Sequence, residues 1–296
     1  MQNFQQRTDL ATEARELATA VGAEELQGVE YSESEAHGNK CQKLVITSTD
    51  GSNALGKPIG TYYTLDISAL IKRENDAFSD TCTALSEILH TLLGEIGENE
   101  CSLVVGLGNR DITPDAIGTN AAAATLVTRH LKEKMPQEFG FFSPVAVISP
   151  GVMGTSGIES ADYIKAVCVE LKPKRVLVVD ALAAKSLDRL CRTVQITDTG
   201  ITPGSGVGNS RAAINSKTLG VPVIALGVPT VVDMKSILAE LTGAEFEIGD
   251  KAASEMIVTP RSIDSEVDCA GRLLGYAINL ALHKGLSVAD IDMFLG

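Results

Sequence analysis

The first quarter of the chain carries one helical pattern and two strand patterns. Between residues 9 and 21 the apolar side chains recur every three or four positions, which is the spacing of one face of a helix. Residues 43–47 and 60–67 are instead rich in β-branched, aliphatic and aromatic side chains, a composition typical of strands. Residues 1–7 fit neither pattern. We therefore expect a short unpatterned segment, then a helix and two strands.

The rest of the chain alternates between helical and strand patterns. The patterns predict helices at 77–95, 116–134, 159–171, 183–191 and 265–283, and strands at 101–107, 145–149, 175–179, 193–197 and 221–226. Strands that alternate with helices form parallel βαβ units. The prediction is an α/β fold with a mostly parallel central sheet and helices on both faces. No linker divides it, although residues 233–264 are mixed and polar and suggest a small peripheral subdomain.

Two of the predicted strands deliver an aspartate just beyond their carboxyl ends. Asp115 follows the strand at 101–107, and Asp180 follows the strand at 175–179. Open α/β sheets usually build their active sites at that edge. Each aspartate taken alone is also explained as a helix cap. Taken together, the two predict a hydrolase in which two carboxylates act as general acid and base.

A loop with four glycines in nine residues, at 200–209, is a second candidate feature. Glycines let a backbone approach a ligand closely, so the N–H groups of this loop are candidate donors to a substrate or an oxyanion. The candidates are Gly204, Ser205, Gly206 and Gly208. The alternative function is a Rossmann-like nucleotide enzyme or a phosphorylase-type enzyme that uses this loop for phosphate, although the glycine spacing is not that of a dinucleotide-binding fingerprint.

The segment Gly51–Pro58 comes close to a phosphate-binding P-loop. Its Gly56-Lys57 pair has the right spacing from Gly51, but Pro58 replaces the hydroxyl residue that would bind Mg²⁺. A strand pattern also follows where a P-loop requires a helix. We therefore expect a turn that joins two strands.

Composition narrows the function further. The net charge of −13 disfavours direct binding to nucleic acid, because phosphate neutralisation needs a basic surface. No apolar run is long enough to cross a membrane, and the N-terminus lacks the apolar stretch of a signal peptide, so we expect a cytoplasmic protein. The six cysteines form no CxxC pair, and the four histidines have no metal-binding spacing. We expect reduced core thiols, and no metal or cofactor.

Four long segments form an ordered set of motifs. They are Gly-Leu-Gly-Asn-x-x-Ile-Thr-Pro-Asp-Ala-Ile-Gly at 106–118, Val-Asp-Ala-Leu-Ala at 179–183, Asp-Thr-Gly-Ile-Thr-Pro-Gly-Ser-Gly-Val-Gly-Asn at 198–209 and Gly-Val-Pro-Thr-Val-Val-Asp at 227–233. The set resembles the germination proteases of endospore-forming bacteria, and the resemblance covers nearly the whole chain. It implies an atypical aspartic endopeptidase, a homotetramer with an α/β fold, that degrades small acid-soluble spore proteins in the spore core when spores germinate.

The resemblance also implies the catalytic residues. The two catalytic aspartates of the family match Asp115, in Thr-Pro-Asp-Ala, and Asp180, in Val-Asp-Ala-Leu-Ala. This chain departs from the family pattern at Thr119, where proline is expected, and at Ser156 and Ser160, where threonine is common. None of these changes alters a carboxylate, so the implied activity is unaffected.

The family further implies a zymogen that removes its own N-terminal segment. Residues 7–13, Arg-Thr-Asp-Leu-Ala-Thr-Glu, resemble the cleavage sequence of the substrates, in which an acidic residue is followed by a bulky apolar one and then a small one. We therefore predict cleavage between Asp9 and Leu10. Residues 1–9 would be the propeptide, and residues 10–296 a single protease domain.

Overall fold

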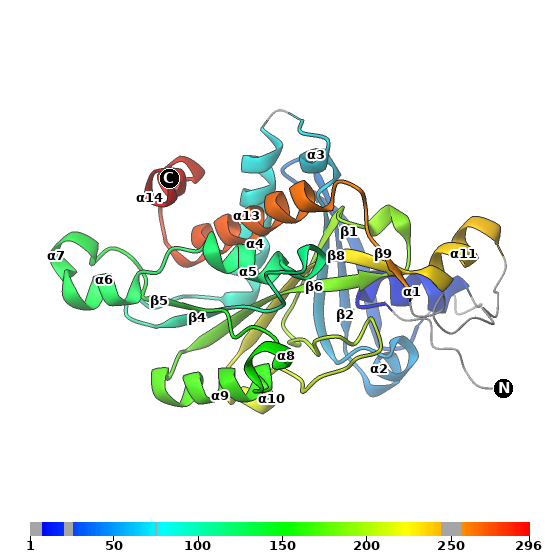
Figure 1. Ribbon diagram of the computed structural model, residues 1–296, viewed down its shortest axis with the longest axis horizontal. Helices are drawn as coiled ribbons and strands as arrows, with labels where there is room; N and C mark the ends of the chain where they lie inside the picture. Colours follow the sequence, from blue (N-terminus) through cyan, green and yellow to red (C-terminus); the bar gives the residue numbers. More distant parts are fainter. Residues whose placement is uncertain (1–7, 21–25, 75, 244–255) are drawn as a thin grey trace.

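One mixed sheet organises the computed structural model of the chain, which describes residues 8–20, 26–74, 76–243 and 256–296 (Figure 1). Nine strands lie within the described residues: β1 (Val29–Ala36), β2 (Asn39–Ile46), β3 (Gly60–Asp66), β4 (Ser102–Gly106), β5 (Val145–Ile148), β6 (Arg175–Ala184), β7 (Thr193–Thr197), β8 (Val223–Asp233) and β9 (Ile257–Val258). Their order in the sheet is β1-β2-β3-β7-β8-β6-β4-β5, and β9 pairs with β8.

The two halves of the sheet differ in strand direction. Strands β8, β6, β4 and β5 pair in parallel, as predicted. Strands β1, β2, β3 and β7 pair antiparallel, and β7 also runs antiparallel to β8. The prediction of a mostly parallel sheet is therefore wrong, and the sheet is mixed. Only two residues, 37 and 38, separate β1 from β2, and so short a hairpin connection forces these strands to run antiparallel.

Helices cover both faces of the sheet, as predicted (Figure 1). On one face, α4 (Ala77–Leu93), α5 (Ile117–Ala123) and α13 (Ile263–Leu282) bury the largest apolar core, and α9 (Ser160–Leu171) and α10 (Ser216–Leu219) cover the other face. Helices α1 (Ala11–Ala20) and α2 (Thr49–Leu55) pack against β2 and β3. The shorter or peripheral helices are α3 (Ser68–Ile71), η1 (Thr113–Asp115), α6 (Arg129–Lys134), α7 (Pro136–Phe139), α8 (Met153–Ser156), η2 (Leu187–Arg189), α11 (Met234–Thr242) and α14 (Val288–Leu295).

The predicted turn at 51–58 is largely the helix α2. The side chain of Ser48 accepts the N–H of Gly51 and caps the first turn, and Gly56 ends the helix in a left-handed conformation with φ of 62°. Lys57 then leads into β3. The segment is thus a capped helix between strands, with no phosphate-binding loop geometry.

The predicted helix at 116–134 is two helices, α5 and α6. The chain between them is bonded to other elements. The N–H of Leu126 donates to Asn279 Oδ1, on α13, at 2.8 Å, and the Oγ1 of Thr128 accepts the N–H of Val145, on β5, at 3.0 Å. The hydroxyl of Thr128 in turn donates to Ser143 O at 2.6 Å. These bonds to α13 and to the start of β5 replace the continuous helix that local periodicity favours.

The predicted helix at 183–191 is wrong. Strand β6 runs on to Ala184, and only the single turn η2 follows. The carboxylate of Glu13, on α1, accepts the N–H groups of Lys185 at 2.8 Å and Ser186 at 2.9 Å. A side chain from a distant part of the chain thus takes up the backbone donors with which a helix would begin.

The remaining differences lie at the edges of the fold. The edge strand β1 and the C-terminal helix α14 were not predicted. Strand β1 is mostly polar and lacks the apolar alternation by which a strand is recognised. The possible subdomain at 233–264 contains α11 and β9, and residues 244–255 of it lie outside the described residues. Among the described helices, none has the length and hydropathy needed to cross a bilayer.

Helix α5 packs closely on the sheet at Gly118. A Cβ added to Gly118 would lie 2.3 Å from Val179 O and 2.4 Å from Leu107 O, far inside van der Waals contact. We expect Gly118→Ala to lower the free energy of unfolding by about 2 kcal/mol or more, measured by urea denaturation. The matched control is Gly154→Ala, where nothing lies within 4 Å of the added methyl. Equal urea concentrations at the midpoint of unfolding for the two variants would contradict this packing.

Candidate active site

Asp180 lies inside the strand β6. It faces Gly227 of β8 in the parallel register, and it is 5% exposed. The prediction had placed it just beyond the end of a shorter strand, and the structure corrects this, because β6 continues four residues past it. Its Oδ1 accepts the N–H of Ala181 at 2.9 Å. A carboxyl group is thus embedded in a strand that is otherwise almost entirely apolar.

Asp115 is the last residue of the 3-10 turn η1 and is half-buried. Its Oδ2 accepts the N–H of Asn109 at 2.8 Å. Gly108, with φ of 95°, lets the chain fold back so closely that a Cβ there would lie 1.9 Å from Asp115 O. The hydroxyl of Thr230, on β8, donates to Pro114 O at 2.7 Å and fixes the turn against the sheet. The turn η1 packs against both β6 and β8.

The structure brings the two predicted aspartates together electrostatically. Burial, and after it the charge of Asp115, raise the pKa of Asp180 well above the ordinary aspartate value, while the hydrogen bond from the Ala181 N–H acts in the opposite direction. Burial also raises the pKa of Asp115, against the hydrogen bond from the Asn109 N–H. The pair can therefore hold one proton and one negative charge at the same time, which is what general acid and base catalysis by two carboxylates requires.

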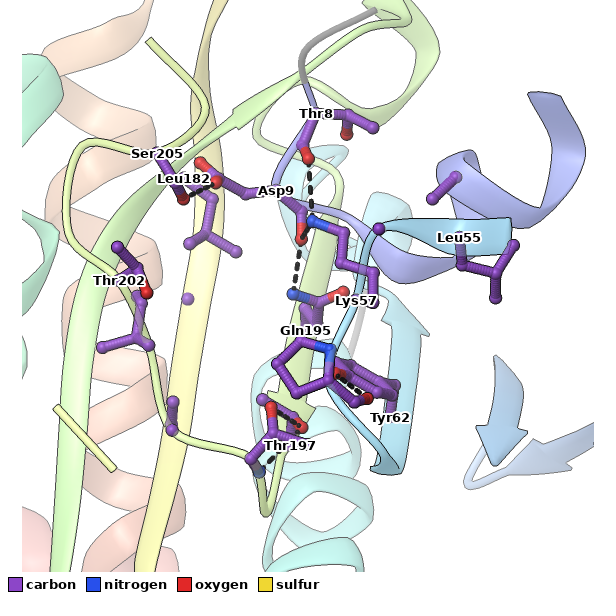
Figure 2. A pocket seen from close by; sticks show the side chains of 18 of the residues that line it. Thr8, Asp9, Leu55, Lys57, Tyr62, Leu182, Gln195, Thr197, Thr202 and Ser205 are labelled. Carbon is purple, nitrogen blue, oxygen red and sulfur yellow. Dashed lines mark hydrogen bonds between the residues drawn. The ribbon is translucent and has the colours of Figure 1, made fainter. Parts of the chain in front are cut away.

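A cavity of about 1130 Å³ lies beside this part of the sheet (Figure 2). It is bounded by the N-terminal segment at Thr8 and Asp9, by α1 and α2, by Leu182 of β6 and Gly227 of β8, and by the glycine-rich loop. The negative charge of Asp9 is a further cause of the raised pKa of Asp180. Asp9, on the N-terminal side of the predicted cleavage point, is therefore close enough to Asp180 for its charge to act on that carboxyl group.

The glycine-rich loop meets the N-terminal segment through Ser205 and Gly206. The hydroxyl of Ser205 donates to Asp9 Oδ1 at 2.6 Å. The backbone N–H groups of Ser205 and Gly208 donate within the loop, to Thr202 O and to Ser205 O, both at 3.2 Å. Gly204 and Gly208 have φ of 73° and 74° and give the loop its shape. The role of this backbone as an oxyanion donor stays a prediction.

Lys57 and Gln195 are two candidate binding residues that the sequence did not indicate. Lys57 Nζ donates to Thr8 O at 2.8 Å and to Asp9 O at 3.0 Å, and Gln195 Nε2 donates to Asp9 O at 3.0 Å (Figure 2). Gln195 is the only amide side chain in the strand Thr193–Thr197, and it is buried. A buried amide in such a strand needs a polar partner, and that was the one available signal.

The described residues hold no group of three or more histidine, cysteine, aspartate or glutamate side chains placed to bind a metal ion. The six cysteines are free thiols. The loop at 200–209 is followed by extended chain, and the next helix, α10, has only four residues. A phosphate site of the dinucleotide-binding kind begins a long helix directly after its loop, so this loop lacks that geometry.

Comparison with known proteins identifies the family. Residues 6–243 match the peptidase A25 family, the germination proteases. The chain belongs to this family. It is 38% identical to the germination protease of Clostridium tetani, over 98% of this chain and 99% of that protein. It is 39% identical to the germination protease of Caldanaerobacter subterraneus subsp. tengcongensis over 98% of both chains, and 41% identical to that of Bacillus cytotoxicus over 85% of this chain and 71% of that protein.

Membership of the germination protease family makes the protein a peptidase. Among solved structures, the NiFe hydrogenase maturation protease HycI from Thermococcus kodakarensis matches 64% of this chain and 98% of its own, with 16% identity and a TM-score of 0.34. A likeness at that level has no bearing on the fold or chemistry of this germination protease family member.

The raised pKa of Asp180 predicts a pH-dependent stability. The folded protein holds a proton that the unfolded chain releases near pH 4. This contribution is complete below that pH and is lost as the pH rises through the raised pKa. In urea denaturation, the free energy of unfolding of Asp180→Asn should decline less with rising pH than that of wild type, because only Asp115 still contributes, and the exposed-site control Asp188→Asn should keep the full decline. Parallel pH profiles for wild type and Asp180→Asn would contradict the assignment.

Proposed function

We propose that this peptidase is an endopeptidase that degrades small acid-soluble spore proteins during germination, with Asp180 as its general acid and Asp115 as its general base. The family supports the activity and the substrate class. The observation that carries the catalytic assignment is the coupling of the two aspartates: one is buried in β6, the other lies in the turn packed against that strand, and the charge of Asp115 raises the pKa of Asp180.

In the proposed mechanism, Asp180 is the acid and Asp115 is the base. The deeper burial of Asp180 favours its neutral form, whereas Asp115 is half-buried and its carboxylate accepts a backbone N–H. Asp115 takes a proton from a water molecule as the water attacks the scissile carbonyl. Asp180 gives its proton to the leaving amine. The proton gained by Asp115 then passes back to Asp180 through solvent, which restores the pair for the next cycle.

The protein is also proposed to be made as a zymogen and to cut itself between Asp9 and Leu10, releasing residues 1–9. Two observations support this. The segment that holds the bond runs beside β6, the strand that carries Asp180, and Leu10 is completely buried beyond it. The homotetramer and the spore-core location follow from the family resemblance and belong to the same proposal.

The net charge of −13 fits these substrates. The family resemblance implies that these substrates coat DNA. DNA repels an acidic protease, whereas basic or unfolded protein released from DNA can still bind to it. The acidic surface therefore favours the protein substrate over the nucleic acid from which it comes.

The catalytic assignment is tested by two conservative variants. Asp115→Asn and Asp180→Asn should each slow cleavage of a small acid-soluble spore protein by at least about 100-fold, because an amide can neither take up nor give the proton. The matched control is Asp111→Asn, an exposed aspartate on the same loop. Gel analysis of the time course and circular dichroism of each variant separate lost chemistry from lost fold. More than a tenth of wild-type activity in either folded variant would remove that aspartate from the mechanism.

Self-processing is tested by intact-mass spectrometry. Incubation of the full chain at mildly acidic pH should give a single product that begins at Leu10, and Asp180→Asn should stay uncut under the same conditions. Active samples that all retain Met1 would rule out removal of residues 1–9 as the activating step.

A further inference from the structure

The N-terminal segment lies against the end of β6 in the manner of a bound peptide. The N–H of Asp9 donates to Ala183 O at 3.0 Å, and the N–H of Ala183 donates to Asp9 Oδ2 at 2.9 Å. The other carboxylate oxygen, Oδ1, accepts the hydroxyl of Ser205 at 2.6 Å. Each oxygen of the Asp9 side chain therefore has a donor, and one backbone bond fixes its position along the strand.

A glycine makes room for this carboxylate. A Cβ on Gly206 would lie 2.2 Å from Asp9 Oδ2 and 2.7 Å from the Cβ of Ala183. Any larger residue at 206 would push the carboxylate away from the Ala183 N–H. The shape of the loop and its one hydroxyl contact are thus both matched to an acidic side chain.

Two further side chains bind the backbone carbonyl of Asp9 itself. Lys57 Nζ and Gln195 Nε2 each donate to Asp9 O at 3.0 Å, whereas Ser205 contacts the side chain of Asp9 (Figure 2). The other end of the Gln195 amide accepts the N–H of Ala11 at 2.7 Å. Two donors on one carbonyl oxygen polarise it and stabilise negative charge that develops there during attack by water. A cation among them strengthens the effect.

The next two residues enter separate apolar clusters. Leu10 is completely buried, and it packs with Leu182, Ala184, Leu190 and Val232. Ala11 is also completely buried, and it packs with Leu44, Ile46, Leu55 and Tyr62. The site therefore holds an acidic, a bulky apolar and a small residue in sequence, each by the chemistry that suits it.

We infer that Ser205, Gly206 and the Ala183 N–H form the subsite for the acidic residue of the cleavage sequence, and that Lys57 and Gln195 bind the carbonyl of the bond to be cut. This rests on the proposed function. The subsite and Asp180 share one strand, since Asp180 precedes Ala183 by three residues on β6. Once residues 1–9 leave, all four donors lose their acceptors on Thr8 and Asp9. The acidic residue of an incoming peptide and its carbonyl supply the same acceptors.

The test compares two peptides with the sequence of residues 4–14, one with the natural aspartate at position 9 and one with asparagine. After release of residues 1–9, the wild-type protein should cleave the aspartate peptide with a kcat/KM at least about tenfold higher than the asparagine peptide, because charged hydrogen bonds are stronger than neutral ones. Gly206→Ala and Ser205→Ala should each reduce this preference at least threefold, mainly through a higher KM for the aspartate peptide. The control Gly154→Ala should leave the preference unchanged.

The carbonyl donors should give a different signature. Lys57→Met and Gln195→Leu should lower kcat for both peptides by similar factors, of about tenfold or more, and leave the preference for aspartate intact. The control Lys165→Met, an exposed lysine on α9, should have no effect. In the full chain, the same Lys57 and Gln195 variants should slow release of residues 1–9.

Different results would contradict the proposed function and the acidic subsite. If the wild-type protein cleaves neither these peptides nor a small acid-soluble spore protein, the proposed function fails. If it cleaves them and the folded Gly206→Ala and Ser205→Ala variants keep the full preference for aspartate, the acidic subsite is wrong. Because Ser205→Ala removes only one hydroxyl, it keeps the test valid if Gly206→Ala does not fold. Unchanged kcat in Lys57→Met and Gln195→Leu would overturn the carbonyl assignment.

Discussion

The burial of one carboxyl group in the middle of a β-strand is the constraint on which the rest of this structure depends. Asp180 is 5% exposed, in a strand whose other residues are nearly all buried and apolar. An isolated carboxylate there would cost several kcal/mol, so burial favours the protonated form and raises the pKa of the group. The neighbouring charge of Asp115 raises that cost further. The fold thus favours a protonated carboxyl group at Asp180 beside the carboxylate of Asp115.

Small residues around Asp180 make this arrangement possible. Gly227, opposite it on β8, leaves space at the strand pairing, since a Cβ there would lie 2.8 Å from Asp180 O. Gly108 and Gly118 let the turn that carries Asp115, and the helix after it, come into contact with the sheet. The N-terminal segment closes the other side, where Asp9 lies alongside the end of β6. Three parts of the chain that are distant in sequence thus meet at β6, and the glycines of two of them let the backbone approach closely.

Much of this could be predicted from the sequence, and the failures have physical causes. The strand at 193–197 and the helices near 77–95 and 265–283 follow strong local periodicity, and the structure has them within a few residues. The continuation of β6 past Asp180 was missed because the carboxylates of Asp9 and Glu13, far away in the chain, bind its backbone donors. The antiparallel half of the sheet was missed because strand direction depends on pairing partners. Lys57 and Gln195 were missed because their acceptors are backbone carbonyls, which no sequence motif marks, and the amide within the strand at 193–197 was the one signal for Gln195.

The most direct test of the account is a carbon-13 NMR titration of the aspartate carboxyl groups in wild-type protein and in Asp115→Asn. The account predicts that Asp180 stays protonated well above pH 4, the ordinary range for an aspartate, and that its pKa falls when the charge of Asp115 is removed. If Asp180 titrates near pH 4 in the folded wild-type protein, or if its pKa is the same in both proteins, the two aspartates do not form a coupled pair. The catalytic assignment then has no physical basis.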